Sequence, residues 1–239
     1  MTVLDLQPDE AHVWYLFPEA VPPALEEQAL ALLTPDEAAR HARFRLPEGR
    51  RDYALTRALV RTTLSRYSEV APANWRFLAG PHGRPAIAAE MGVPLHFNLS
   101  HTKGLIACVV GLEPEIGIDV EAITSDRANL AIAARYFSAA EVAALAGRPG
   151  LFFDLWTLKE AYLKARGLGV GLPLDQLSFE LDERGVTVSF DPGLNDAAAT
   201  WQFDRLFPSE QHRVATAIRR RSPTRIRIVE RTVTTPADR

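Results

Sequence analysis

The chain has 239 residues, of which 47% are hydrophobic and 24% are charged, and this composition is ordinary for a soluble globular protein with one large or two small domains. Its net charge of −3 gives no general reason to expect nucleic acid or an anionic membrane as a partner. The single cysteine excludes an internal disulfide, and neither a signal peptide nor an apolar run long enough to span a bilayer is visible, so the sequence predicts a cytoplasmic protein.

The first third of the chain predicts one strand followed by two helices. Residues 12–17 form a β-type run that is ended by a proline. Thr34 has the pattern of a helix N-cap, with Pro35 at the first helical position and Glu37 three residues after the cap. The apolar spacing over residues 48–67 predicts a second, longer helix.

The middle of the chain predicts two strands and a capped helix. The runs 105–111 and 116–120 are separated by Leu-Glu-Pro-Glu, and this spacing predicts a hairpin. A helix is predicted to begin at Ser138, with Glu141 three residues later in a capping box and Gly147 past its end.

The last part of the chain predicts one strong helix and then only strands. Residues 151–166 have the strongest helical pattern, which Gly167 closes. Mostly antiparallel strands are predicted at 177–181, 185–190, 200–207, 212–218 and 225–230. The polar tail after Glu230 is expected to be frayed. These elements predict a mixed α+β fold in two halves that join near residues 112–116.

Two carboxylates stand two residues apart in a predicted strand. Asp119 and Glu121 would point to the same face, roughly 7 Å apart, while Ile118 and Val120 point the other way. Mg²⁺ suits such a pair because it prefers hard oxygen ligands and needs only one or two carboxylates plus substrate phosphates. The alternative is a half-exposed strand with solvated acids.

A third carboxylate lies on the strong helix. Trp156, Glu160 and Lys164 are spaced i, i+4 and i+8, so they share one stripe. The glutamate and lysine alone could be a surface ion pair. The aromatic residue one turn earlier favours a partly buried stripe, from which Glu160 could complete a metal site.

The N-terminal part is rich in cationic side chains. Eight arginines lie between residues 40 and 66 against two acids, and Arg84, Ser100, His101 and Lys103 follow. Guanidinium groups and hydroxyls suit a polyphosphate ligand. The alternatives are a basic solvent face of an amphipathic helix and, for His101, a structural role. Together with the carboxylates, this pattern indicates phosphoryl-type transfer or nucleotide binding.

Three motifs in this order resemble the 4′-phosphopantetheinyl transferases, in particular the larger surfactin-type group: FNLSHT (97–102), GIDVEAI (117–123) and WTLKEAYLKARGLG (156–169). The resemblance extends over residues 34–182 and includes Gly-Arg-Pro at 83–85. It implies an enzyme that transfers the phosphopantetheine group of coenzyme A to a serine of an apo acyl or peptidyl carrier protein and releases adenosine 3′,5′-bisphosphate. It also implies two similar α/β halves with pseudo-twofold symmetry in a monomer, here residues 1–113 with the coenzyme contacts and 114–239 with the carboxylates.

The resemblance assigns roles residue by residue. Asp119, Glu121 and Glu160 match the Mg²⁺ ligands, and Mn²⁺ is a possible substitute. The matched coenzyme A contacts are Arg40, Arg84, Ser100, His101 and Lys164. The chain departs from its relatives at Glu37, where they carry a lysine just before the position of Arg40. This region is the loosest part of the match.

The general base has two candidates. Glu160 could accept the serine proton directly or through a metal-bound water, and His101 is the competing candidate. Two other functions stay open at this stage, a coenzyme A or nucleotide-binding module without catalysis and a nucleic-acid binder. The intact carboxylate triad argues against the first, and the acidic overall balance argues against the second.

Overall fold

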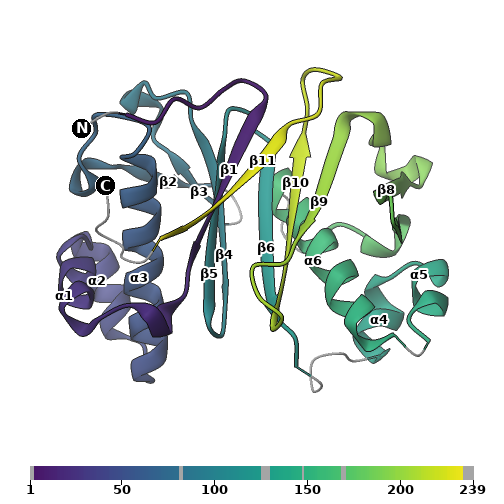
Figure 1. Ribbon diagram of the computed structural model, residues 1–239, viewed down its shortest axis with the longest axis horizontal. Helices are drawn as coiled ribbons and strands as arrows, with labels where there is room; N and C mark the ends of the chain where they lie inside the picture. Colours follow the sequence, from purple (N-terminus) through teal and green to yellow (C-terminus); the bar gives the residue numbers. More distant parts are fainter. Residues whose placement is uncertain (1–2, 81–82, 125–129, 147, 168–170, 234–239) are drawn as a thin grey trace.

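The computed structural model describes residues 3–80, 83–124, 130–146, 148–167 and 171–233 and has four layers (Figure 1). Two sheets face each other in the middle, and helices cover the outer side of each sheet. The principal helices are α1 (Pro23–Ala31), α2 (Pro35–Ala42), α3 (Pro47–Leu64), α4 (Leu130–Tyr136), α5 (Ala139–Ala144) and α6 (Pro149–Arg166).

Each sheet has a core of three antiparallel strands. The first has the order β11-β1-β5-β4 and consists of β1 (Glu10–Leu16), β4 (His96–Thr102), β5 (Leu105–Gly111) and β11 (Arg227–Val233). The second has the order β6-β10-β9 and consists of β6 (Ile116–Ala122), β9 (Trp201–Leu206) and β10 (His212–Arg219). Two separate hairpins are formed by β2 (Phe77–Ala79) with β3 (Pro85–Ile87) and by β7 (Leu177–Asp182) with β8 (Gly185–Phe190).

The two halves repeat the same order of elements. A strand leads through three helices and a hairpin to two more strands, first from β1 to β5 and then from β6 to β10. The sheet orders β1-β5-β4 and β6-β10-β9 correspond, and α3 packs on the first sheet as α6 packs on the second. This repeat is the predicted α+β fold with two similar halves.

A buried ion pair is repeated as well. Glu37, in the capping box at the start of α2, contacts Arg61 of α3 at 2.8 Å. Glu141, in the capping box at the start of α5, contacts Lys159 of α6 at 2.8 Å. In both halves the cation also donates to a backbone carbonyl just ahead of the hairpin. Glu37 therefore ties α2 to α3.

The predicted hairpin between residues 105–111 and 116–120 is wrong. Both edges of β5 are occupied, by β1 and β4, so β6 pairs instead with β10 in the other sheet. The two strands meet only through side chains, because Val109, Ile118 and their neighbours form the apolar core between the sheets. A run buried on both faces is typical of a central strand, whose two neighbours the sequence does not identify.

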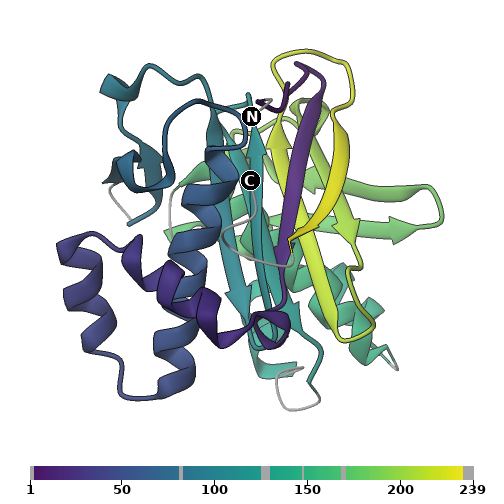
Figure 2. The same ribbon diagram turned by 60° about the vertical axis from the view of Figure 1, so that its left-hand side comes forward.

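The last strand of the chain pairs with the first one. In Figure 2 the last strand, β11, runs beside β1, with which it pairs in parallel. This pairing orders the chain as far as Val233, so the tail is not frayed from Glu230 as predicted. Gly147, predicted to follow the helix at Ser138, and residues 234–239 lie outside the described residues.

Candidate active site

The two halves meet where β4 lies beside β6. The Asn98 side chain accepts a hydrogen bond of 3.0 Å from the backbone N–H of Ile118, and the Ser100 hydroxyl donates one of 2.9 Å to Asp119 Oδ1. Side chains of FNLSHT thus contact GIDVEAI at the boundary between the sheets. Two of the three motifs are brought together in this way.

Gly117 brings the third motif to the same place. A Cβ atom at this position would lie 2.1 Å from the carbonyl oxygen of Ala161 and 2.5 Å from the nitrogen of Ala165, both in α6. Only glycine allows this approach of helix to strand, because the obstructing atoms are backbone. Glu160 and Lys164, which precede these two alanines, are therefore held against β6.

Gly117→Ala should lower the free energy of unfolding by about 3 kcal/mol, because overpacking against backbone forces α6 away from β6. Transfer activity should fall with it, since Glu160 moves away from Asp119. Urea unfolding and a transfer assay measure both effects. Gly111→Ala is the matched control, because its added Cβ would meet side chains and no backbone, the end of Ile116 at 2.9 Å and the Cβ of Ala11 at 3.6 Å. Equal stability and activity in the two variants would contradict the packing argument.

Asp119 lies at the boundary between the two halves. Its side chain is 7% exposed, and its Oδ1 lies 2.7 Å from the Lys164 ammonium. The same ammonium donates to the Ser100 hydroxyl, also at 2.7 Å. Asp119 Oδ2 is buried and has no hydrogen-bond partner among the described residues. One oxygen of this carboxylate is therefore left for a further ligand.

Glu160 is electrostatically coupled to the two carboxylates of β6. Burial raises the pKa of Glu160 to about 7; the charges of Asp119 and Glu121 contribute to the rise, and Lys164 opposes it. The predicted stripe on α6 is partly buried, since Trp156 stacks on Phe152. Within the described ranges no three His, Cys, Asp or Glu side chains form a ready metal-binding group. Glu160 thus lies within electrostatic reach of the carboxylates of β6, but the three side chains are not close enough together to form a metal-binding group.

His101 follows Ser100 on β4 and is exposed. Partial desolvation lowers the pKa of His101; Asp52 of α3 opposes this effect, whereas the positive charges of Lys164 and Arg57 add to it. His101 therefore lies in the electrostatic field of α3, between the arginine-rich helices and the carboxylates. Arg57 was not among the residues selected from the sequence, where it is one of eight similar arginines.

The two other predicted basic residues differ in their surroundings. Arg40 is exposed on α2, with its guanidinium 5.7 Å from the ring centre of Tyr53, which Arg57 approaches to 5.1 Å. Arg84 is not free, because it donates three hydrogen bonds of 2.8 Å to the carbonyls of Lys164, Ala165 and Ile116. It thereby caps the C-terminal end of α6. The predicted contact of Arg84 with a coenzyme phosphate stays a prediction, for which two of the five N–H groups of its guanidinium are not used by these three bonds.

Comparison with known proteins agrees with this geometry. The 4′-phosphopantetheinyl transferase superfamily matches residues 115–217. The 4′-phosphopantetheinyl transferase HetI of Nostoc sp. is 35% identical over 225 residues, which cover 90% of each chain. The chain belongs to the 4′-phosphopantetheinyl transferase family. It is also 32% identical to the transferase Sfp of Bacillus subtilis over 66% of this chain and 71% of Sfp.

One similar solved structure contains coenzyme A. It is the holo-[acyl-carrier-protein] synthase of Helicobacter pylori in complex with coenzyme A, with 17% identity and a TM-score of 0.37 over 43% of the transferase and 97% of that chain. As a 4′-phosphopantetheinyl transferase, the protein is an enzyme that transfers phosphopantetheine from coenzyme A to a carrier protein. No helix among its described residues is long and apolar enough to cross a membrane.

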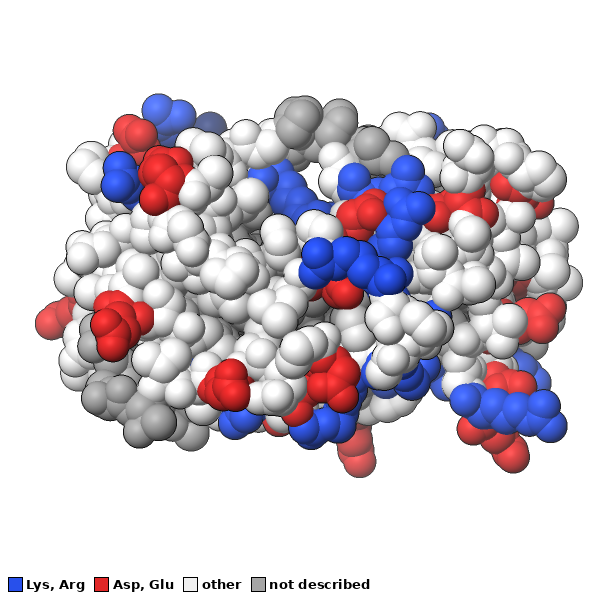
Figure 3. All heavy atoms as spheres, turned by 90° about the horizontal axis from the view of Figure 1, so that it is seen from above, with Lys and Arg blue, Asp and Glu red and all other residues white. Residues whose placement is uncertain are grey.

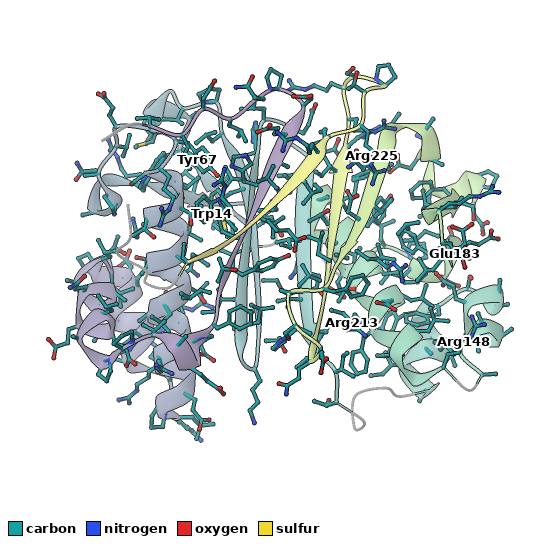
Figure 4. The ribbon with its side chains drawn as sticks, viewed as in Figure 1. Trp14, Tyr67, Arg148, Glu183, Arg213 and Arg225 are labelled. Atoms are coloured by element: carbon teal, nitrogen blue, oxygen red, sulfur yellow. The ribbon has the colours of Figure 1, made fainter. Side chains whose placement is uncertain are left out.

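The transferase carries the carboxylates in only one of its two similar halves. Arg66 follows the buried Arg61 as Lys164 follows the buried Lys159, and the Arg66 guanidinium lies 4.6 Å from the ring of Trp14. An indole in the N-terminal half thus stands where Asp119 stands in the other half. Figure 4 shows Trp14 near Tyr67, to whose hydroxyl its indole N–H donates at 2.7 Å.

Proposed function

We propose that β4, β6 and α6 border a cleft in which phosphopantetheine is transferred from coenzyme A to a serine of an acyl or peptidyl carrier protein. The observation that carries this proposal is the placement of Glu160 and Lys164 against Asp119, on the boundary between the halves. Adenosine 3′,5′-bisphosphate would be the second product. Coenzyme A would lie in the cleft with its phosphates toward Ser100, His101 and Lys164.

The carboxylates fit a divalent metal ion, Mg²⁺ or Mn²⁺. Asp119 offers a buried oxygen without a hydrogen-bond partner within the described part of the chain. Burial raises the pKa of Glu160, and the nearby charges of Asp119 and Glu121 add to this rise. Asp119, Glu121 and Glu160 would hold the ion, and carboxylate oxygens are the ligands that Mg²⁺ prefers. The bound ion would supply positive charge to the pyrophosphate of coenzyme A.

The protein's own residues have separate tasks in this proposal. Lys164 and His101 would orient the phosphates, with Arg57 and Arg40 extending the cationic surface over α3 and α2. Glu160 would accept the proton of the serine hydroxyl, directly or through a metal-bound water. His101 is the competing base.

The finer properties of the enzyme also belong to the proposal. We expect a monomer in the cytoplasm, because one chain supplies both sides of the cleft, FNLSHT from one half and the carboxylates from the other. We expect no nucleic-acid or membrane partner. On the face seen in Figure 3, basic and acidic side chains lie next to one another. Ion pairs, such as that of Arg221 with Glu113 at 2.7 Å, reduce the electrostatic field of either sign.

Mass spectrometry tests the proposal directly. The protein is incubated with coenzyme A, Mg²⁺ and an apo carrier protein, and the carrier is expected to gain the mass of one phosphopantetheine group. A carrier whose acceptor serine is replaced by alanine is the control and should gain nothing. Binding of coenzyme A without any gain in carrier mass would support a non-catalytic binding module instead.

A further inference from the structure

Lys164 has its ammonium group beside Asp119, where a metal ion is proposed to bind. Its ammonium lies 2.7 Å from both Asp119 Oδ1 and the Ser100 hydroxyl, and its side chain is 29% exposed. The partner carboxylate is 7% exposed, so the pair is desolvated on the aspartate side and open to solvent on the lysine side. Four rotatable bonds allow the ammonium to leave without any movement of α6.

The same ammonium is attracted to two different anions. In the free protein, Asp119 is the carboxylate in contact with Lys164, and Glu160 lies one turn earlier on the same helix. The pyrophosphate of coenzyme A, which we place in this cleft, carries more negative charge than one carboxylate. A divalent cation at Asp119 would repel the ammonium, whereas a phosphate would attract it.

We propose that Lys164 makes metal binding and coenzyme A binding depend on one another. In the free enzyme Lys164 neutralises Asp119 from Oδ1 and repels a metal ion that would bind the same carboxylate through Oδ2. When coenzyme A is bound, its phosphates draw the ammonium away and leave the carboxylate to the metal. This inference rests on the proposed function of the cleft and assigns Lys164 a role before any chemistry begins.

Reciprocity follows from thermodynamic linkage. If coenzyme A strengthens metal binding by some factor, the metal strengthens coenzyme A binding by the same factor. Removing the ammonium should therefore strengthen metal binding to the free enzyme and weaken the coupling between the two ligands. A charge-assisted contact of this kind corresponds to a change of about tenfold or more in affinity.

Titration with Mn²⁺, followed by the electron paramagnetic resonance of the free ion, measures this coupling without turnover. Mn²⁺ is added to the protein with and without coenzyme A, in the absence of a carrier protein. Without coenzyme A, Lys164→Met should bind Mn²⁺ about tenfold more tightly than the wild type. Coenzyme A should then increase the Mn²⁺ affinity of the variant by a smaller factor than that of the wild type. Lys164→Arg keeps the charge and should behave like the wild type.

Lys103→Met is the matched control. Lys103 is an exposed lysine in the turn between β4 and β5, and its loss changes the net charge equally without touching Asp119. Unchanged or weaker Mn²⁺ binding in free Lys164→Met would overturn the inference, as would an equal gain in Lys103→Met. If the wild type binds no Mn²⁺ even with coenzyme A, it is the proposed metal site that fails.

Discussion

Glu160→Gln should lower the rate of phosphopantetheine transfer by about 10³-fold, because it removes both a metal ligand and the proposed base. In the absence of a divalent metal ion, binding of coenzyme A should remain largely intact, since the proposed contacts of Ser100, His101 and Lys164 are kept. Single-turnover transfer and calorimetric titration with coenzyme A measure the two quantities separately. Turnover equal to that of the wild type would exclude Glu160 as the base.

The same variant should make the metal-free protein more stable. Glu160 has an ordinary pKa of 4.5 when unfolded and about 7 when folded. Because the folded protein holds this proton more tightly, the wild type loses stability as the pH rises from 4.5 to about 7. Glutamine does not ionise, so at pH 8 the variant should gain about 2 kcal/mol in the free energy of unfolding. The gain should vanish near pH 4.

Two further variants separate this effect from general changes. Glu180→Gln removes an exposed carboxylate on β7 and should change neither transfer nor the pH dependence of stability. His101→Ala should weaken coenzyme binding and leave a slower but measurable reaction. If His101→Ala instead abolishes turnover while binding is unchanged, His101 is the base. A stability gain in Glu160→Gln that does not depend on pH would contradict the charge argument.

Lys159→Met should lower the free energy of unfolding by about 3–5 kcal/mol. Lys159 directly precedes Glu160, but we assign it no part in binding or catalysis. Its ammonium is fully buried, 2.8 Å from Glu141, and donates to the carbonyls of Leu174 and Leu177. Removing it leaves Glu141 as a buried charge without a counter-ion and removes the hydrogen bonds to the two carbonyls. Urea unfolding measures the loss.

The partner of Lys159 provides the control. In Glu141→Gln/Lys159→Met the uncompensated charge is gone, so part of the lost stability should return relative to Lys159→Met alone. Arg61→Met removes the corresponding cation of the N-terminal half and should cost less, because Glu37 is 16% exposed and keeps Arg57 at 3.8 Å. A loss below about 1 kcal/mol in Lys159→Met would show that the buried pair contributes little.

Local patterns predicted the elements well where they depend on neighbouring residues. The capping boxes at Thr34 and Ser138 form as expected, and the long helix ends at Gly167 with a φ of +63°. The predicted hairpin after residue 111 fails because strand partners are chosen by distant segments. Similarly, no local pattern distinguishes Arg57, which lies near His101, from Arg61, which is buried against Glu37.

The sequence by itself determined which residues are chemically suited to the site, since spacing alone places Asp119 with Glu121 on a strand and Glu160 with Lys164 on a helix. Only the tertiary structure decided that the two pairs meet, because a glycine at 117 admits α6 against β6. It also decided that two lysines of α6 differ: Lys159 forms a buried ion pair with Glu141, whereas Lys164 contacts Asp119. The burial and the charge partners of a side chain depend on which elements pack together. The two halves share a fold but no visible sequence repeat, so their packing cannot be read from the sequence.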